Sequence, residues 1–160
     1  MKKLLVLLTV TLAMSLFMVS CGDDEPTGPS EPKIGEMTAS VGGNNWAAQN
    51  AVYNNFSNHV TGLYVAEPLT NPTKITSISV KLDKITGEPA VGKYLAICFY
   101  EESEGYPPNS IVKIWTDISG NCEITEITDT EIKGTFTFTG TNIEDNSTKS
   151  VSGKFYTPRQ

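Results

Sequence analysis

Two stretches near the C-terminus decide the fold: Ile132–Thr139, with the sequence IKGTFTFT, and Val151–Tyr156, with the sequence VSGKFY. Both alternate apolar residues with small or polar ones, which is the period-two pattern of a strand with one buried face. Both also contain the motif [IV]-x-G-x-F, which places a glycine and a phenylalanine on the same face. A glycine on an apolar face leaves room for a large neighbouring ring or for a bend in the sheet.

The rest of the chain from Met37 onward has the same character. Short threonine-rich, β-branched and aromatic segments alternate with Gly, Pro, Asn and Asp, and no window shows apolar residues at helical spacing. We expect an all-β domain, an antiparallel β-sandwich or closed barrel of about eight to ten strands. Further strands are predicted at His59–Ala66, Ile78–Asp83, Gly92–Tyr100, Ile111–Trp115 and Ile124–Ile127, with turns at Val41–Trp46, Asp129–Thr130 and Gly140–Lys149.

The segment Gly92–Tyr100 differs from the other predicted strands because it is apolar on both faces. Strands that alternate strictly, such as Ile78–Asp83, present one face to water. A strand without that alternation is typical of a central position covered on both sides. We therefore predict a doubly covered strand here.

The N-terminus has the features of an export signal. Lys2 and Lys3 precede an apolar stretch from Leu4 to Val19, and a polar run follows it. Crossing a bilayer as a helix takes about 20 apolar residues, and this stretch is shorter. Residues 1–20 are therefore predicted to be a signal peptide, with an uncleaved membrane anchor as the alternative.

The four residues Met18-Val19-Ser20-Cys21 resemble the lipobox of bacterial lipoproteins. The resemblance implies that the Cys21 sulfur receives a diacylglyceryl group, that the chain is cut before Cys21, and that the new amine is acylated, for example with palmitate. Two or more acyl chains hold a protein stably on a membrane, because each buried CH₂ contributes about 0.8 kcal/mol. Cys21 is followed by Gly22 and three acids, which is similar to the export signal of surface lipoproteins in Bacteroidota. The expected location is the outer membrane, including the cell surface, with a merely solvated acidic linker as the alternative interpretation.

Composition divides the remainder into two parts. Residues 21–36 contain the lipidated cysteine and a Pro-, Gly- and acid-rich run that cannot bury apolar surface, so we predict a disordered tether. Residues 37–160 are the length of one domain. Without Lys2 and Lys3, 10 basic and 18 acidic residues remain, a formal charge of −8. Such an acidic chain is not expected to bind nucleic acid, and the lipid on Cys21 is its expected membrane contact.

Several stretches are similar to a family of small Bacteroidota lipoproteins that has no assigned activity. They are Met37–Ala47, Val91–Tyr94, Ile132–Phe138 and Val151–Phe155, and the likeness spans nearly all of the predicted mature chain. The resemblance implies a location in the cell envelope and an all-β fold. It supplies no catalytic residue.

The residues capable of chemistry form no recognisable motif. Cys98 and Cys122 either form a disulfide, as in many exported proteins, or are two separate buried thiols. His59 is the single histidine, and Asn-His-Val at a strand start gives it no special setting, so we interpret it as a surface or strand-edge residue. The acidic runs 101–104 and 144–146 are weak candidates for calcium loops and are interpreted as solvated loop tips. We predict no catalytic residue, metal or cofactor.

Aromatic residues are the remaining candidates for recognition. Tyr106, Trp115 and Trp46 are proposed as binding aromatics, although most large aromatics in a small β domain are core. The function predicted from the sequence is a non-enzymatic envelope module that binds a glycan, a small apolar ligand or an envelope protein. One alternative is a structural or adhesion component, which requires an exposed sheet edge or flat apolar patch. Another is a hydrolase, which requires convergent polar groups in a cleft.

Overall fold

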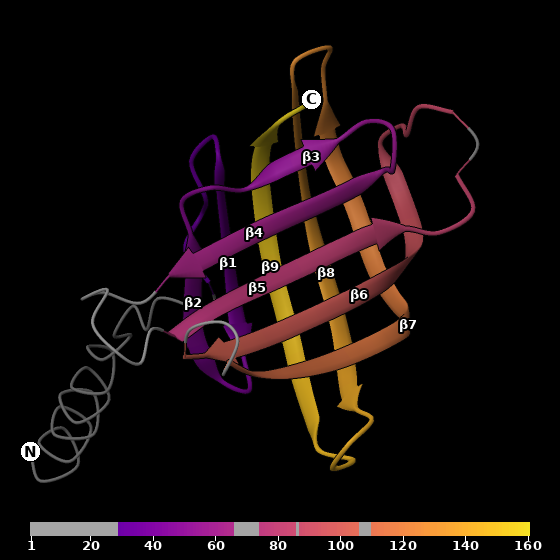
Figure 1. The fold of residues 1–160 in the computed structure, drawn as a ribbon. Coiled ribbons are helices and arrows are strands. Elements are labelled where there is room, and N and C mark those ends of the chain that lie inside the picture. The colour runs from indigo at the N-terminus through magenta and orange to yellow at the C-terminus, as the bar shows by residue number, and fades with distance from the viewer. Residues whose placement is uncertain (1–28, 66–73, 86, 106–109) are drawn as a thin grey trace, which may run out of the picture.

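The computed structural model describes residues 29–65, 74–85, 87–105 and 110–160, so the predicted signal peptide and Cys21 lie outside the described residues. The described residues form one nine-stranded antiparallel sheet in the order β2-β1-β9-β8-β7-β6-β5-β4-β3 (Figure 1). The predictions of an all-β fold and of eight to ten strands are confirmed. The strands are β1 (Glu36–Val41), β2 (Asn44–Ala48), β3 (Val52–Asn54), β4 (His59–Val65), β5 (Lys74–Leu82), β6 (Gly92–Glu104), β7 (Ile111–Ile127), β8 (Glu131–Asn142) and β9 (Thr148–Pro158).

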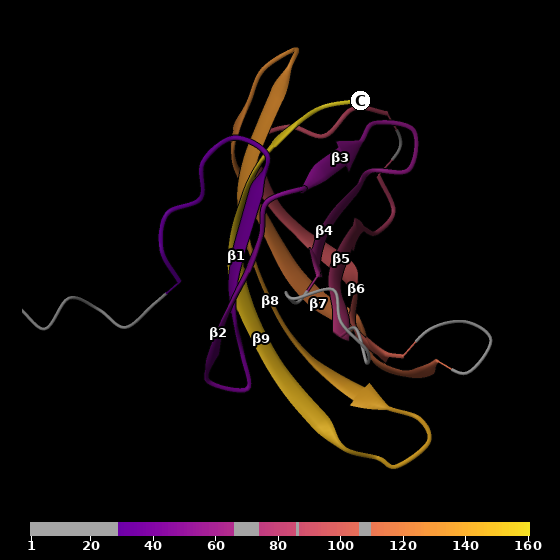
Figure 2. The same ribbon diagram turned by 60° about the vertical axis from the view of Figure 1, so that its left-hand side comes forward.

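The sheet rolls over so that its two halves face each other. Strands β4, β5 and β6 cross in front of β1, β9 and β8 in Figure 1, and Figure 2 shows the two layers side by side. Strand β7 belongs to both layers, because its pairing shifts between Thr116 and Asn121 on the β8 side. The sequence predicted two strands, Ile111–Trp115 and Ile124–Ile127. The structure joins them into one long strand, since irregular pairing bends a strand without ending it.

The two motif-bearing strands, β8 and β9, are neighbours with complementary register. Gly134 lies opposite Phe155, and Phe136 lies opposite Gly153. A Cβ on Gly134 would lie 2.5 Å from the Phe155 ring, and a Cβ on Gly153 would lie 2.5 Å from the Phe136 ring. Each ring therefore covers the glycine of the other strand, a cross-strand arrangement that pins register. The prediction that these glycines make room for a large ring is confirmed.

The first hairpin follows from two glycines. Val41 pairs with Asn44, which leaves Gly42 and Gly43 as the loop, and both have positive φ angles of 56° and 85°. Two consecutive positive φ angles define the type I′ turn that suits the twist of a hairpin, and glycine adopts them without a Cβ clash. The turn predicted within Val41–Trp46 is confirmed.

The C-terminus closes one end of the rolled sheet. Tyr53 in β3 forms a parallel bridge with Arg159, and the Gln160 amide donates to the Tyr53 carbonyl at 2.9 Å. The Arg159 side chain is 5% exposed, donates to Asn55 Oδ1 at 2.9 Å and lies 3.3 Å from Glu88. A buried guanidinium held in this way fixes both the chain end and the neighbouring loop.

The described part of the predicted tether contacts the domain. The Thr38 hydroxyl donates to the Ser30 carbonyl at 2.6 Å, Glu31 forms an ion pair with Lys154, and the Gly35 amide donates to Tyr156 at 2.7 Å. These contacts belong to residues 30–35. Residues 21–28 of the predicted tether lie outside the described residues.

Candidate functional site

Strand β6 is central in the sheet, but only its inner face is covered by other described elements. Ala96 and Cys98 on the inner face are fully buried, whereas Leu95 on the outer face is 57% exposed. Ile97 and Phe99 also point outward and are partly exposed. The prediction of a doubly covered strand is therefore wrong for the described chain, because the sheet packs on itself and leaves one side of this strand uncovered.

Outward-pointing residues of four adjacent strands extend this uncovered area, which we call the β4–β7 face. Leu63, Val112 and Ile114 on it are 41–43% exposed, and short hydroxyl side chains of Ser and Thr lie between the apolar ones. The face consists of His59, Thr61, Leu63, Ile75, Ser77, Ser79, Lys81, Ile97, Phe99, Glu101, Ser103, Val112, Ile114 and Thr116.

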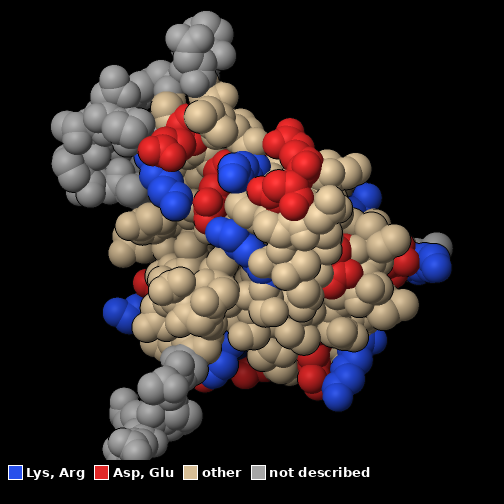
Figure 3. Space-filling model, turned by 90° about the horizontal axis from the view of Figure 1, so that it is seen from below, with Lys and Arg blue, Asp and Glu red and all other residues tan. Residues whose placement is uncertain are grey.

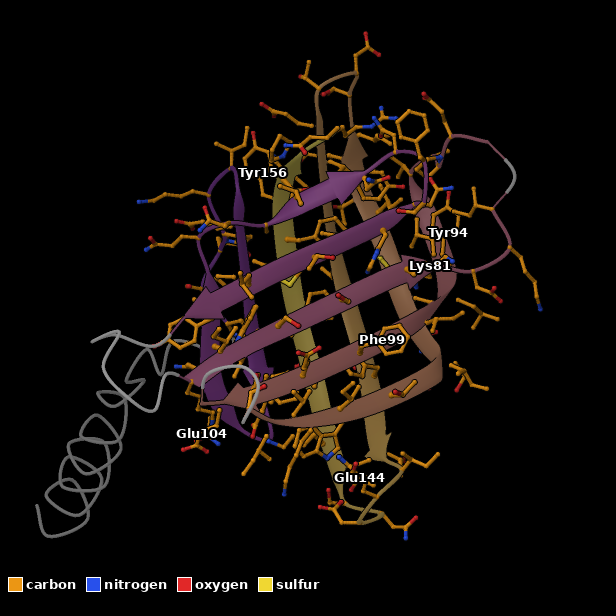
Figure 4. The ribbon with its side chains drawn as sticks, viewed as in Figure 1. Lys81, Tyr94, Phe99, Glu104, Glu144 and Tyr156 are labelled. Carbon is orange, nitrogen blue, oxygen red and sulfur yellow. The ribbon has the colours of Figure 1, made fainter. Side chains whose placement is uncertain are left out.

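The β4–β7 face contains three ionisable side chains, those of His59, Lys81 and Glu101. Lys81 and Glu101 are the two that carry a full charge at neutral pH. Neither forms an ion pair with another described residue, whereas most described lysines do. Ser79 lies opposite Phe99, and Lys81 and Glu101 lie two residues to either side of that pair. The two charges therefore occupy opposite corners around a central Ser79–Phe99 pair. Figure 4 shows Lys81 and Phe99 on the side facing the viewer.

His59 lies at the margin of this face and has no catalytic setting among the described residues. Burial lowers its pKa, and the positive charge of Lys81, its cross-strand neighbour, lowers it further. Its Nε2 atom lies 3.4 Å from the Thr61 hydroxyl. A ring next to a lysine and kept neutral in this way has no carboxylate to orient it as a general base.

The predicted binding aromatics do not form an exposed platform. Trp115 is 4% exposed, donates from Nε1 to Ser147 Oγ at 2.9 Å and lies against Tyr100, so its assignment as a binding residue is wrong. It is buried because bulky residues of β6 and β7 meet inside the roll. Trp46 is half-buried and donates to Thr76 Oγ1 at 2.7 Å, which ties β2 to β5 across the roll. Tyr106 lies outside the described residues.

Charged groups gather at the end of the roll opposite the C-terminus. Glu102 accepts from Tyr100 at 2.9 Å, pairs with Lys149 and lies 3.8 Å from Lys74. The Lys149 ammonium also lies 4.2 Å from the centre of the Trp115 ring. Burial raises the pKa of Glu102, but its bonds to Lys149 and Tyr100 outweigh that effect and the net pKa is lowered. Basic and acidic side chains lie close together at this end in Figure 3.

These pairs leave little room for a cation at either acidic run. Glu102 is already held by two lysines, and Asp145 accepts from Ser147 and lies 3.7 Å from Lys113. Across the described ranges, no group of three or more His, Cys, Asp or Glu side chains is arranged to hold a metal ion.

A hollow of about 330 Å³ lies over β6, β7 and β8, and no pattern in the sequence predicted it. The side chains around it that point outward are Lys93, Asn121, Glu123, Thr135 and Thr137. Lys93 and Glu123 form a loose 3.9 Å pair, so the hollow carries balanced charge. It forms where short threonines stand between longer neighbours, which requires knowledge of the register.

Cys98 and Cys122 are free, buried thiols in the structure. Burial raises the pKa of each to about 12. Ala96 pairs with Gly120 and Tyr94 pairs with Cys122, so the two cysteines are offset by about four residues, or ~13 Å, along neighbouring strands. A disulfide needs Cα atoms within ~7 Å. Of the two alternatives, the structure shows two separate thiols.

No family model, curated protein or solved structure matches this chain. Within the described ranges, the structure contains no helix long and apolar enough to span a bilayer.

Proposed function

We propose that this protein is a lipid-anchored component of the cell envelope whose β domain binds another protein without catalysing a reaction. The proposed signal peptide is residues 1–20. The proposed anchor is the lipid on Cys21, which would hold the protein in the outer membrane. The observation that carries the proposal of partner binding is the β4–β7 face, which presents Leu63, Phe99 and Ile114 to solvent.

Apolar surface exposed to water is unfavourable in free energy, and a second molecule that covers it removes this penalty. Each Å² of apolar surface withdrawn from water contributes about 25 cal/mol, and contiguous apolar patches on a soluble domain mark contact surfaces. The outward residues of β6, Leu95, Ile97 and Phe99, have the apolar character of a covered strand. A partner protein would supply the cover that the described chain does not.

Binding of a small apolar ligand inside the roll has less support. Phe136, Phe155, Tyr53 and Trp115 fill the space between the layers and are all at most 4% exposed. A glycan is a second candidate ligand, for the hollow over β6, β7 and β8, where Asn121, Thr135 and Thr137 offer both donors and acceptors.

The anchor is tested by mass spectrometry and fractionation of cells that produce wild type or Cys21→Ala. We expect the wild-type N-terminal peptide to start at an acylated Cys21 and the protein to sediment with the outer membrane, while the variant does neither. An unmodified Cys21 in wild type would overturn the lipoprotein assignment.

Partner binding is tested by placing a photo-crosslinking amino acid at Ile114 on the β4–β7 face and, as a control, at Thr141 on the outer face of β8. Irradiated cells should give a discrete cross-linked species from the Ile114 position and none from the Thr141 position. Equal cross-linking from both positions, or none from Ile114, would contradict a specific contact at this face.

A further inference from the structure

We propose that the partner of the β4–β7 face is a second copy of this chain, related by a two-fold axis, with Lys81 of each copy paired to Glu101 of the other. This inference deepens the proposed function, on which it rests, by naming the partner.

The composition of the face suits contact with a like surface. Antiparallel sheets pack face to face about 10 Å apart, with strands within about 30° of each other, when both faces carry apolar side chains. Phe99 lies beside the short side chains of Ser77 and Ser79, so its ring protrudes above its neighbours on β5. Two copies of this face would bury Ile97, Phe99 and Ile114 against the same residues.

The two charges select a symmetric arrangement. Lys81 and Glu101 lie diagonally across the Ser79–Phe99 pair, at equal distances along antiparallel strands. A two-fold axis that lies in the contact plane above that pair, perpendicular to the line from Lys81 to Glu101, exchanges the two corners. Each Lys81 then meets the partner's Glu101, which makes the interface isologous. Both groups lack an ion-pair partner among the described residues of their own chain.

The charge balance of the face also favours a copy of itself over a highly charged partner. The full chain has a formal charge of −6, but the β4–β7 face carries one lysine and one glutamate. A strongly basic or acidic partner gains no net attraction at this site, since steering requires a field of one sign. A face of balanced charge gains most from a surface with the same two charges in reciprocal positions.

The size of the face predicts a weak dimer. Four strands at ~4.8 Å spacing and about six residues at ~3.3 Å give a footprint of roughly 400 Å². Stable interfaces bury about 800 Å² on each partner. We therefore expect the dimer to form where the chain is concentrated, as it is for proteins held on one membrane surface.

The test is disulfide cross-linking of the full chain in its own membranes through Ser79→Cys, next to the proposed axis. Mild oxidation should give a dimer of twice the monomer mass that reduction removes, and Thr141→Cys should give at least ~10-fold less. Native Cys98 and Cys122 are buried and do not compete. Absence of the dimer, or equal yields from the two positions, would overturn the proposal.

The charges are tested in the Ser79→Cys background. Lys81→Glu and Glu101→Lys should each lower the dimer yield at least ~5-fold, because like charges then meet, and the double exchange should restore it. Retained protease resistance of each variant shows that the fold is intact. Unchanged yields in both single variants would contradict the reciprocal pair. A cross-link from Ser79→Cys to a different protein would overturn the second copy but leave the proposed partner-binding function standing.

Discussion

Strands β8 and β9 use their apolar residues differently from strand β6. In β8 and β9 the apolar residues lie on the inner face, with Phe136 and Phe155 covering glycines, and the outer face is Thr, Ser, Lys and Tyr. In β6 the apolar residues lie on both faces, and the outer ones, including Phe99, have no cover within the described chain. The Gly–Phe pairs specify the register of β8 and β9. Strand β6 carries outward apolar surface that the described chain does not bury.

The comparison predicts its largest effect for Phe155→Ala. Phe155 is 2% exposed and fills the space left by Gly134, so its removal creates a cavity that the rigid sheet cannot close. We expect a loss of about 3–5 kcal/mol in the free energy of unfolding, measured by urea denaturation. A loss below about 1 kcal/mol would show that the ring does not cover the glycine.

Filling a glycine should have the next largest effect. A Cβ on Gly153 would lie 2.5 Å from the Phe136 ring and 2.5 Å from the Thr38 carbonyl oxygen, which is backbone and cannot move aside freely. Gly153→Ala should therefore destabilise by about 1–3 kcal/mol through overpacking. Gly42→Ala provides no matched control because its φ is positive. A suitable one is Ser152→Ala, the exposed neighbour, which should change stability by less than about 0.5 kcal/mol.

The ionic end of the roll should respond to pH. The pKa of Glu102 is lowered in the folded chain, so its stabilising contribution is complete above the unfolded pKa, about 4.3, and is lost as pH falls through the folded pKa. Glu102→Gln should cost about 1 kcal/mol at pH 7 and progressively less below about pH 4. Denaturation curves of both proteins at pH 7 and pH 3 test this, and a constant difference would contradict it.

A phenylalanine-to-alanine substitution on the outer face of β6 can be compared directly with Phe155→Ala. Phe99→Ala removes a partly exposed ring, so it should lower the stability of the dilute protein by about 1 kcal/mol or less, against several for Phe155→Ala. Its main effect should be on self-association. If the two alanine variants were equally destabilised in urea, the outer ring would belong to the core.

The smallest effect on stability is expected at the hollow over β6, β7 and β8. Thr137→Val keeps the β-branched shape but removes an exposed hydroxyl, so stability should change by less than about 0.5 kcal/mol. If the hollow binds a glycan, titration calorimetry with that glycan should show weaker binding for Thr137→Val and unchanged binding for Thr141→Val. Equal effects of the two variants would argue against recognition by the hollow.

The strands of the two regions also differ in how well the sequence predicted them. Strict alternation and the repeated Gly-x-Phe spacing were enough to predict most of the strands and the role of Gly134 and Gly153, since both follow from local periodicity. The double cover of β6 was predicted wrongly, because apolar residues on both faces do not say whether the second cover comes from the same chain. The burial of Trp115 and the hollow depend on register and on the bend in β7, which are set by tertiary packing.

The most direct test of this account is hydroxyl-radical footprinting of the full chain, comparing oxidation of Phe99 and Phe155 in membranes and after dilution in detergent. We predict that Phe155 is protected in both states, while Phe99 is protected in membranes and becomes oxidised on dilution. Protection of Phe99 at every dilution would mean that the chain covers its own β6. Oxidation of Phe99 in both states would mean that no partner binds the β4–β7 face.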